Sequence, residues 1–170
     1  MKSYELNRMA SSITKIQSIL PASLQPIAIT YVFNSMVKLA GTAGIRIESL
    51  TQTRATITLP NKRKIQNHIG GLHACSMALA AESATGILIG MNVRDSHLPL
   101  IKRMEVDFVR RCEGDIRVEA SLSEEDYVRI HEEEKGEVWM PCKVEDESGR
   151  EPIKARMLWA WVAKQRRSKL

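Results

Sequence analysis

The sequence lacks both a long hydrophobic run and a recognisable signal peptide. Its longest apolar run, Ile27 to Phe33, is far shorter than the roughly 20 residues that a membrane-spanning helix needs. Tyr4, Glu5 and Arg8 interrupt the segment where a signal peptide would require a continuous apolar stretch. We therefore expect a cytoplasmic protein without a membrane partner.

Cysteine is scarce, and its spacing is irregular. The three cysteines, Cys75, Cys112 and Cys142, are odd in number and form no CxxC pair. This argues against a disulfide framework and against a structural zinc site. We expect buried, reduced thiols, and neither a metal ion nor a cofactor.

Aromatic residues are also few, at 5% of the chain, and they are not interleaved with the basic clusters at 62–64 and 164–169. The net charge of +5 alone is weak support for nucleic-acid binding, because no aromatic side chains are placed to stack on bases. The hydrophobic content of 44% over 170 residues is typical of one globular domain. We expect a single domain over 1–170, with N-terminal helices in 1–41 and the core in 44–165.

Two periodicities divide the chain. Apolar residues at helical spacing predict a helix over 6–20, ended by Pro21, and a second helix from an N-cap at Ser23 to Gly41. A period of two then predicts a β-hairpin, and the same period returns near the C-terminus with turn signals at 113–115 and 148–150. The strands on either side of each turn are expected to pair antiparallel. The strands are expected at 45–47, 55–59, 104–108, 116–122, 138–144 and 153–161, with a short capped helix at 123–135.

Between the two groups of strands, a long helix is expected from His73 to about Ile89. It is rich in alanine and almost uncharged, so it should be buried on most sides, and small side chains let a neighbouring backbone come close. A curved antiparallel sheet wrapped around this helix would satisfy both features. The fold class is therefore predicted as α+β.

Glu82 is the notable exception in this apolar helix. Burying a carboxylate costs several kcal/mol or raises its pKa, so such a residue is retained for a structural pair or for chemistry, and the sequence leaves these two roles open. The preceding loop contains Asn67 and the pair Gly70-Gly71, which allows a tight turn. The first amides of the helix that follows would be free to hold an oxyanion.

The order Asn67, His73, Glu82, on a loop entering an alanine-rich helix, resembles the hotdog-fold acyl-CoA thioesterases. The closest branch is that of the phenylacetyl-CoA and Them2-like enzymes. The segments 98–108 and 157–161 resemble the hotdog group known as DUF4442.

The resemblance implies a hotdog fold, in which a sheet cradles one long helix, and a homodimer or tetramer with active sites between subunits. It implies that Glu82 acts as base or nucleophile on an acyl-CoA thioester, that Asn67 places water or thioester, and that His73 orients the loop. The Ala74 amide would polarise the carbonyl. Substrate contacts are expected from Gly71, Cys75, Arg94, Lys102 and Arg103. The last three and the cluster Lys62-Arg63-Lys64 are candidates for contacts with the phosphates of coenzyme A, and the alternative for each is a solvated surface position.

One departure from the family pattern keeps a second function open. His73-Ala74-Cys75 stands where His-Gly-Gly is common, so the amide at position 74 is retained but Cys75 is bulkier than glycine. The alternatives are a protein that binds acyl-CoA without hydrolysing it and, from charge alone, a nucleic-acid or partner-binding protein. His73 also has a purely structural alternative, as a helix N-terminal residue bonded to backbone.

Overall fold

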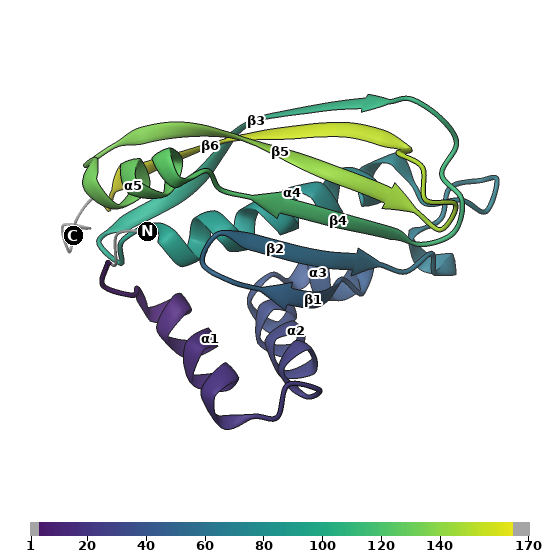
Figure 1. Ribbon diagram of the computed structural model, residues 1–170. Coiled ribbons are helices and arrows are strands. Elements are labelled where there is room, and N and C mark those ends of the chain that lie inside the picture. The colour runs from purple at the N-terminus through teal and green to yellow at the C-terminus, as the bar shows by residue number, and fades with distance from the viewer. Residues whose placement is uncertain (1–3, 165–170) are drawn as a thin grey trace, which may run out of the picture.

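The computed structural model describes residues 4–164 and shows one curved sheet packed around one long helix (Figure 1). The helices are α1 (Arg8–Ile19), α2 (Gln25–Met36), α3 (Lys38–Ala43), α4 (Ala74–Asn92) and α5 (Glu124–Glu132), with a short 3-10 turn η1 (Arg63–Ile65). The strands are β1 (Arg46–Leu50), β2 (Arg54–Leu59), β3 (His97–Phe108), β4 (Ile116–Ser121), β5 (Gly136–Asp146) and β6 (Ile153–Ala163). This confirms the predicted α+β class and the hotdog arrangement.

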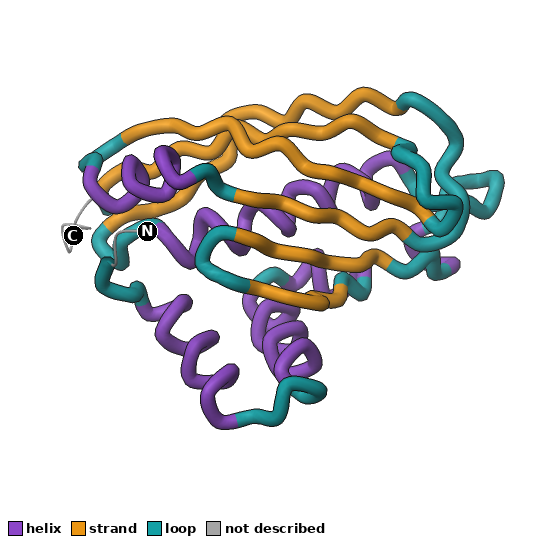
Figure 2. Tube along the Cα trace, viewed as in Figure 1, coloured by secondary structure: helices purple, strands orange, loops and turns teal. Residues whose placement is uncertain are grey.

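All strand pairs are antiparallel, and the spatial order is β1-β2-β4-β5-β6-β3. The strand β6 lies between β5 and β3, in the interior of the sheet. The core lies between the concave face of the sheet and α4, while α1, α2 and α3 lie on the other side of α4 (Figures 1 and 2). Strands β1 and β3 form the two edges.

Helix α4 is the centre of the core. It is long and apolar enough to cross a membrane by length and composition, which the sequence interpretation did not recognise, but most of it is buried inside the protein. Three of its alanines, Ala80, Ala81 and Ala84, have no exposed surface. The helix continues to Asn92, three residues beyond the predicted end, and the amide of Asn92 donates to the Leu88 and Gln52 carbonyls, both at 2.8 Å.

The second N-terminal helix differs from its prediction. It is broken at Val37 into α2 and α3, and the chain leaves the helix at Gly44, whose φ of 86° is left-handed, rather than at Gly41. The predicted cap at Ser23 is wrong: Leu24 occupies the N-cap position and makes no side-chain cap bond. The prediction placed the end at the wrong glycine because Gly41 serves a packing role instead.

Strand β3 was predicted too short and with the wrong neighbour. It begins at His97 rather than near 104, and it pairs along its length with β6, whereas β4 pairs with β2 and β5. The turn signal at 113–115 therefore ends a crossover and does not close a hairpin. The β1–β2 and β5–β6 hairpins and the Ser123 cap, whose Oγ accepts from the Asp126 N–H at 3.0 Å, are confirmed.

Candidate active site

Glu82 lies on the one stripe of α4 that its own chain does not cover. The stripe consists of the exposed or half-buried residues Ala74, Cys75, Ala78, Leu79, Glu82 and Gly86. Burial raises the pKa of Glu82, and the only opposing effect is a hydrogen bond at 3.4 Å from the Ser83 hydroxyl to Oε2. No cation of the described residues pairs with this carboxylate, so the structural ion pair that the sequence left open is not formed within the chain.

Trp159 and Gly86 shape the surroundings of this carboxylate. A methyl group on Gly86 would lie 3.2 Å from the Trp159 ring and 3.5 Å from Oε1 of Glu82, so the glycine leaves room for both groups. The indole is fixed by a 2.9 Å hydrogen bond from its Nε1 to the Thr85 hydroxyl. The carboxylate therefore has an apolar wall on one side and an opening on the other.

Asn67 organises the loop before α4. Its side-chain oxygen accepts from the backbone N–H groups of Ile69 at 3.0 Å and Gly71 at 3.1 Å, and its Nδ2 donates to the Leu72 carbonyl at 3.4 Å. A backbone bond of 2.8 Å from the Asn67 N–H to the Gly71 carbonyl closes the same turn. The carboxamide thus has one N–H left for a substrate or a water molecule.

His73 is the N-cap of α4. Its Nδ1 accepts from the Cys75 N–H at 3.1 Å, which puts the proton of the neutral ring on Nε2. This arrangement is a structural role for His73, through a backbone amide rather than the backbone carbonyl of the sequence-based alternative. Because the Cys75 N–H donates to His73, it is not free to bind a substrate oxygen. The Ala74 N–H, at the first helical position, has no acceptor within residues 4–164 and remains free to bind an oxyanion.

Within one chain, the free amide and the carboxylate are too far apart to act on the same atom. Eight residues separate Ala74 from Glu82, which at ~1.5 Å per residue is about 12 Å along the helix axis. Asn67, Gly71, His73 and Ala74 are brought together at the N-terminus of α4, but Glu82 is not among them. Catalysis by both groups would need a second copy of the chain.

The predicted phosphate contacts are scattered. Arg94 follows the C-terminal end of α4, the end opposite Ala74, where it pairs with Glu134 at 2.9 Å. Lys102 and Arg103 lie on the edge strand β3, and Lys102 is paired with Glu137. A single chain therefore does not gather Arg94, Lys102 and Arg103 beside the loop at Asn67.

Other cations are closer to that loop. Lys62, Arg63 and Lys64 are exposed just before it, on and beside η1. The sequence interpretation missed Arg111, whose guanidinium donates to the Ile69 carbonyl at 3.4 Å. It could not be found from the sequence, because Arg111 reaches the loop only through the crossover that follows β3.

The described thiols and acids offer no metal site. Cys112 and Cys142 are buried, as predicted, and burial raises the pKa of Cys142 to about 12. Cys75 is exposed, contrary to the prediction, because it points away from the sheet at the start of α4. In residues 4–164 no three His, Cys, Asp or Glu side chains are placed to hold a metal ion.

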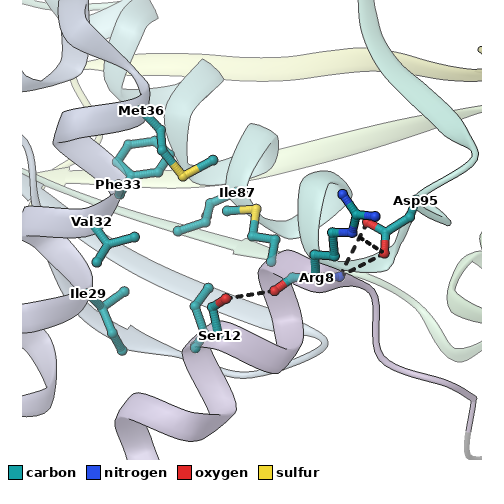
Figure 3. Close-up of a pocket in the computed structure, with 10 residues that line it drawn as sticks. Arg8, Ser12, Ile29, Val32, Phe33, Met36, Ile87 and Asp95 are labelled. Atoms are coloured by element: carbon teal, nitrogen blue, oxygen red, sulfur yellow. Dashed lines mark hydrogen bonds and ion pairs between the residues drawn. The ribbon is translucent and has the colours of Figure 1, made fainter.

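A separate apolar cavity of about 330 Å³ lies between α1 and α2, away from Glu82 (Figure 3). Ile29, Val32, Phe33 and Met36 of α2 face it, and Ile87 of α4 forms its floor. Arg8 and Asp95, paired at 3.8 Å, lie at one side. The cavity shares no residue with the α4 stripe, so it is not a pocket for the carboxylate.

Comparison with protein-family models identifies the chain. Residues 27–162 match the model described as a domain of unknown function, DUF4442, which covers most of the sequence from α2 to β6. The chain is a DUF4442 protein. A comparison with curated proteins gave no match.

Solved structures place this DUF4442 protein among hotdog thioesterases in fold. PA5026 from Pseudomonas aeruginosa, described as a probable thioesterase, is 25% identical, with a TM-score of 0.71 over 85% of this chain and 97% of that chain. The thioesterase HI1161 from Haemophilus influenzae is 12% identical, with a TM-score of 0.66 over 82% of this chain and 94% of that one. SAV0944 from Staphylococcus aureus is 18% identical, with a TM-score of 0.62 over 74% of this chain and 98% of that one.

Proposed function

We propose that this DUF4442 protein hydrolyses acyl-CoA thioesters without a metal ion, in a dimer whose active sites combine residues of both subunits. The observation that carries the proposal is the half-buried Glu82 carboxylate, without a cation partner among the described residues, on the uncovered stripe of the helix whose first amide is free. A raised pKa suits a general base, since a carboxylate with a higher pKa binds a proton more strongly.

Strand β3 supports dimer formation. It is an edge strand of twelve residues, and an edge of that length is a template for another strand. Its exposed apolar side chains include Leu98, Leu100, Met104 and Phe108, with exposed fractions of 44 to 53%. Pairing of β3 with its own copy would extend the sheet across a two-fold axis and cover these side chains.

The same axis would bring the separated catalytic groups together. Ile101 of β3 is in register with Trp159, whose ring lies against Gly86 on the α4 stripe, so the β3 edge and the stripe form one continuous surface. A two-fold axis through that surface lays two α4 helices side by side in opposite directions. Ala74 of one subunit would then face Glu82 of the other.

In the proposed reaction, the Glu82 carboxylate removes a proton from water as the water oxygen attacks the thioester carbonyl carbon. The Ala74 N–H, assisted by the positive end of α4, holds the negative carbonyl oxygen of the tetrahedral intermediate. The carbon–sulfur bond then breaks, the acid is released, and the thiolate of coenzyme A takes up the proton. Asn67 holds the loop that positions the Ala74 amide, and its remaining N–H orients the water or thioester.

Basic side chains near the loop suit the phosphates of coenzyme A. We assign this role to Lys62, Arg63, Lys64 and Arg111, which are near the N-terminus of α4 in the same chain. Lys102 and Arg103 lie on the proposed dimer edge and would contribute from either subunit.

The spacing of two residues in one structural relative agrees with the roles proposed for Asn67 and Glu82. SAV0944 has been crystallised with a glutamine replaced by alanine and, separately, with a glutamate fifteen positions later replaced by alanine. Asn67 and Glu82 are also fifteen positions apart. The spacing supports the use of an amide at position 67 and a carboxylate at position 82 in the proposed site, where the two come from different subunits.

The test is release of free thiol from short, medium, long and aromatic acyl-CoAs by wild type, Glu82→Gln and Ala74→Pro. Proline fits the first position of a helix and removes only the N–H, and His73, with φ −66° and ψ 143°, already has the conformation that precedes proline. We expect kcat to fall about a hundredfold or more for each variant.

The matched control is Glu145→Gln, the same substitution on β5 outside the stripe, which should retain activity. Absence of wild-type turnover on every acyl-CoA would reject hydrolysis. If acyl-CoA nevertheless raised the melting temperature, the chain would be a binding protein, the alternative suggested by Cys75 in place of glycine.

A further inference from the structure

The N-terminal helices carry apolar side chains that the rest of the chain leaves uncovered. Leu24, Ile27 and Tyr31 recur at three- and four-residue spacing on α2, and Leu39 follows on α3. Their exposed fractions are 47, 66, 76 and 64%. We call these four side chains the α2–α3 surface. The opposite side of α2, with Ile29 and Phe33, is buried. The helix is therefore packed against the protein on that side and exposes only the other.

This region has an unusual charge distribution. From position 6 to position 47 the sequence contains no aspartate or glutamate, while Arg8, Lys15, Lys38 and Arg46 are all basic. Arg46 lines the same hollow as Ile27, Lys38 adjoins Leu39, and Lys15 is one helical turn before the exposed Ile19. Within residues 4–164 no acidic side chain pairs with Lys15, Lys38 or Arg46. The only acid at the hollow, Glu48, is paired with Arg117 at 2.8 Å.

We propose that the α2–α3 surface docks the protein on an anionic lipid membrane, with its apolar side chains in the acyl boundary and the neighbouring cations on the lipid headgroups. Exposed apolar residues flanked by lysine and arginine are the pattern of interfacial helices. The acid at the hollow, Glu48, has its charge paired with Arg117. In Figure 1 the α1–α2 connection and α2 lie at the end of the molecule away from β3, so a flat surface can approach them without touching β3. The proposal does not depend on the proposed hydrolysis.

Charge favours a membrane over other occupants. A second copy docking through the same surface would place Lys15, Lys38 and Arg46 against their own equivalents, with no acid of that segment between them. A nucleic acid would satisfy the cations, but three of the four side chains of the surface are aliphatic and cannot stack on bases. An anionic bilayer offers both an apolar layer and negative charge.

The experiment is co-sedimentation of the full-length protein with vesicles of phosphatidylcholine alone or mixed with phosphatidylglycerol, at low and high salt. We expect binding only to the anionic vesicles and weaker binding at high salt. The double variant Ile27→Ser/Tyr31→Ser should bind about tenfold more weakly or worse, because two exposed apolar anchors are lost. Lys15→Glu/Lys38→Glu should weaken binding by a similar factor.

The matched control is Val109→Ser, which replaces an apolar side chain of 48% exposure outside α1 to α3 and should bind as wild type. Thermal melting checks that all variants are folded. The proposal is overturned if wild type binds neither vesicle, or if Val109→Ser loses binding as severely as the double variant. It is also overturned if light scattering shows that Ile27→Ser/Tyr31→Ser changes the number of subunits, since the surface would then join two copies.

Discussion

At the scale of single residues, the half-buried Glu82 links the proposed chemistry to the stability of the fold. Burial makes the neutral carboxylic acid more favourable in the folded state than in the unfolded state, so the folded protein binds the proton more tightly. Between the ordinary glutamate pKa and the raised pKa, the native state therefore holds more protons, and stability falls as pH rises. Such a cost is expected where a residue is retained for chemistry.

We therefore predict that Glu82→Gln melts at a higher temperature than wild type at pH 7 to 8, and that the two melting curves converge as pH falls below the ordinary glutamate value of 4.5. Thermal unfolding of both proteins across this pH range measures the effect. Glu145→Gln, at a partly exposed glutamate on β5 that is paired with Lys143 at 2.8 Å, is the control and should show no such gain in stability. A Glu82→Gln protein less stable than wild type at pH 8 would contradict the assignment of a buried, unpaired carboxylate.

The loop residues show how little of the site depends on side-chain chemistry. Asn67 and His73 both use their polar atoms to bond backbone N–H groups, which fixes the turn and the start of α4. What the proposed mechanism uses from this loop is one N–H of Asn67 and the Ala74 amide, and the latter is a group that every residue except proline would supply. The residue type at position 74 therefore says little about the proposed role of its backbone N–H. That role depends on the position of the residue in the first turn of the helix.

At the scale of the elements, the approach of α3 to α2 depends on Gly41. A methyl group on Gly41 would lie 2.8 Å from the Asn34 carbonyl oxygen, which is backbone and cannot rotate away. Close packing of two helix backbones, and not the end of a helix, accounts for this glycine.

Gly41→Ala should accordingly destabilise the protein by about 1–2 kcal/mol, since the overpacking outweighs the higher helix propensity of alanine. Chemical denaturation gives the value. Gly90→Ala in α4 is the matched control: its new methyl group would meet the flexible side chain of Met9 at 3.2 Å, so stability should change little. Equal effects of the two substitutions would show that the Asn34 contact is not limiting.

At the scale of the whole molecule, one chain does not complete the proposed active site. Roughly 12 Å of helix separates the Ala74 amide from Glu82, so the proposed mechanism needs one group from each subunit. This requirement for two subunits can be tested without knowing the native substrate.

Mixing Ala74→Pro chains with Glu82→Gln chains should restore activity that neither variant has alone. In a mixed dimer one site would combine the intact Ala74 of one chain with the intact Glu82 of the other. After unfolding and refolding together, half of the dimers are mixed and each has one good site, so about a quarter of wild-type activity is expected. Light scattering verifies the dimer, and activity no higher than the sum of the two variants would place both groups of a site in the same chain.

The sequence by itself determined the parts of the fold that local periodicity controls. The helical spacing of α1, the period of two in β2, β4, β5 and β6, the cap at Ser123 and the alanine-rich α4 were all predictable, because each depends on neighbours within a few positions. The isolated Glu82 in α4 could be recognised for the same reason. No local pattern distinguished Gly41 from Gly44 as the end of the second helix.

Only the tertiary structure decided which elements meet. The pairing of β3 with β6, the contact of Arg111 with the loop at Ile69, and the separation of Ala74 from Glu82 depend on the crossover after β3 and on the closure of the sheet around α4. The same is true of the α2–α3 surface, because α2 is apolar on all sides and only its packing against β1 and α1 determines which side chains stay exposed. Contacts between residues far apart in the chain are set by the packing of whole elements, which no short window of sequence encodes.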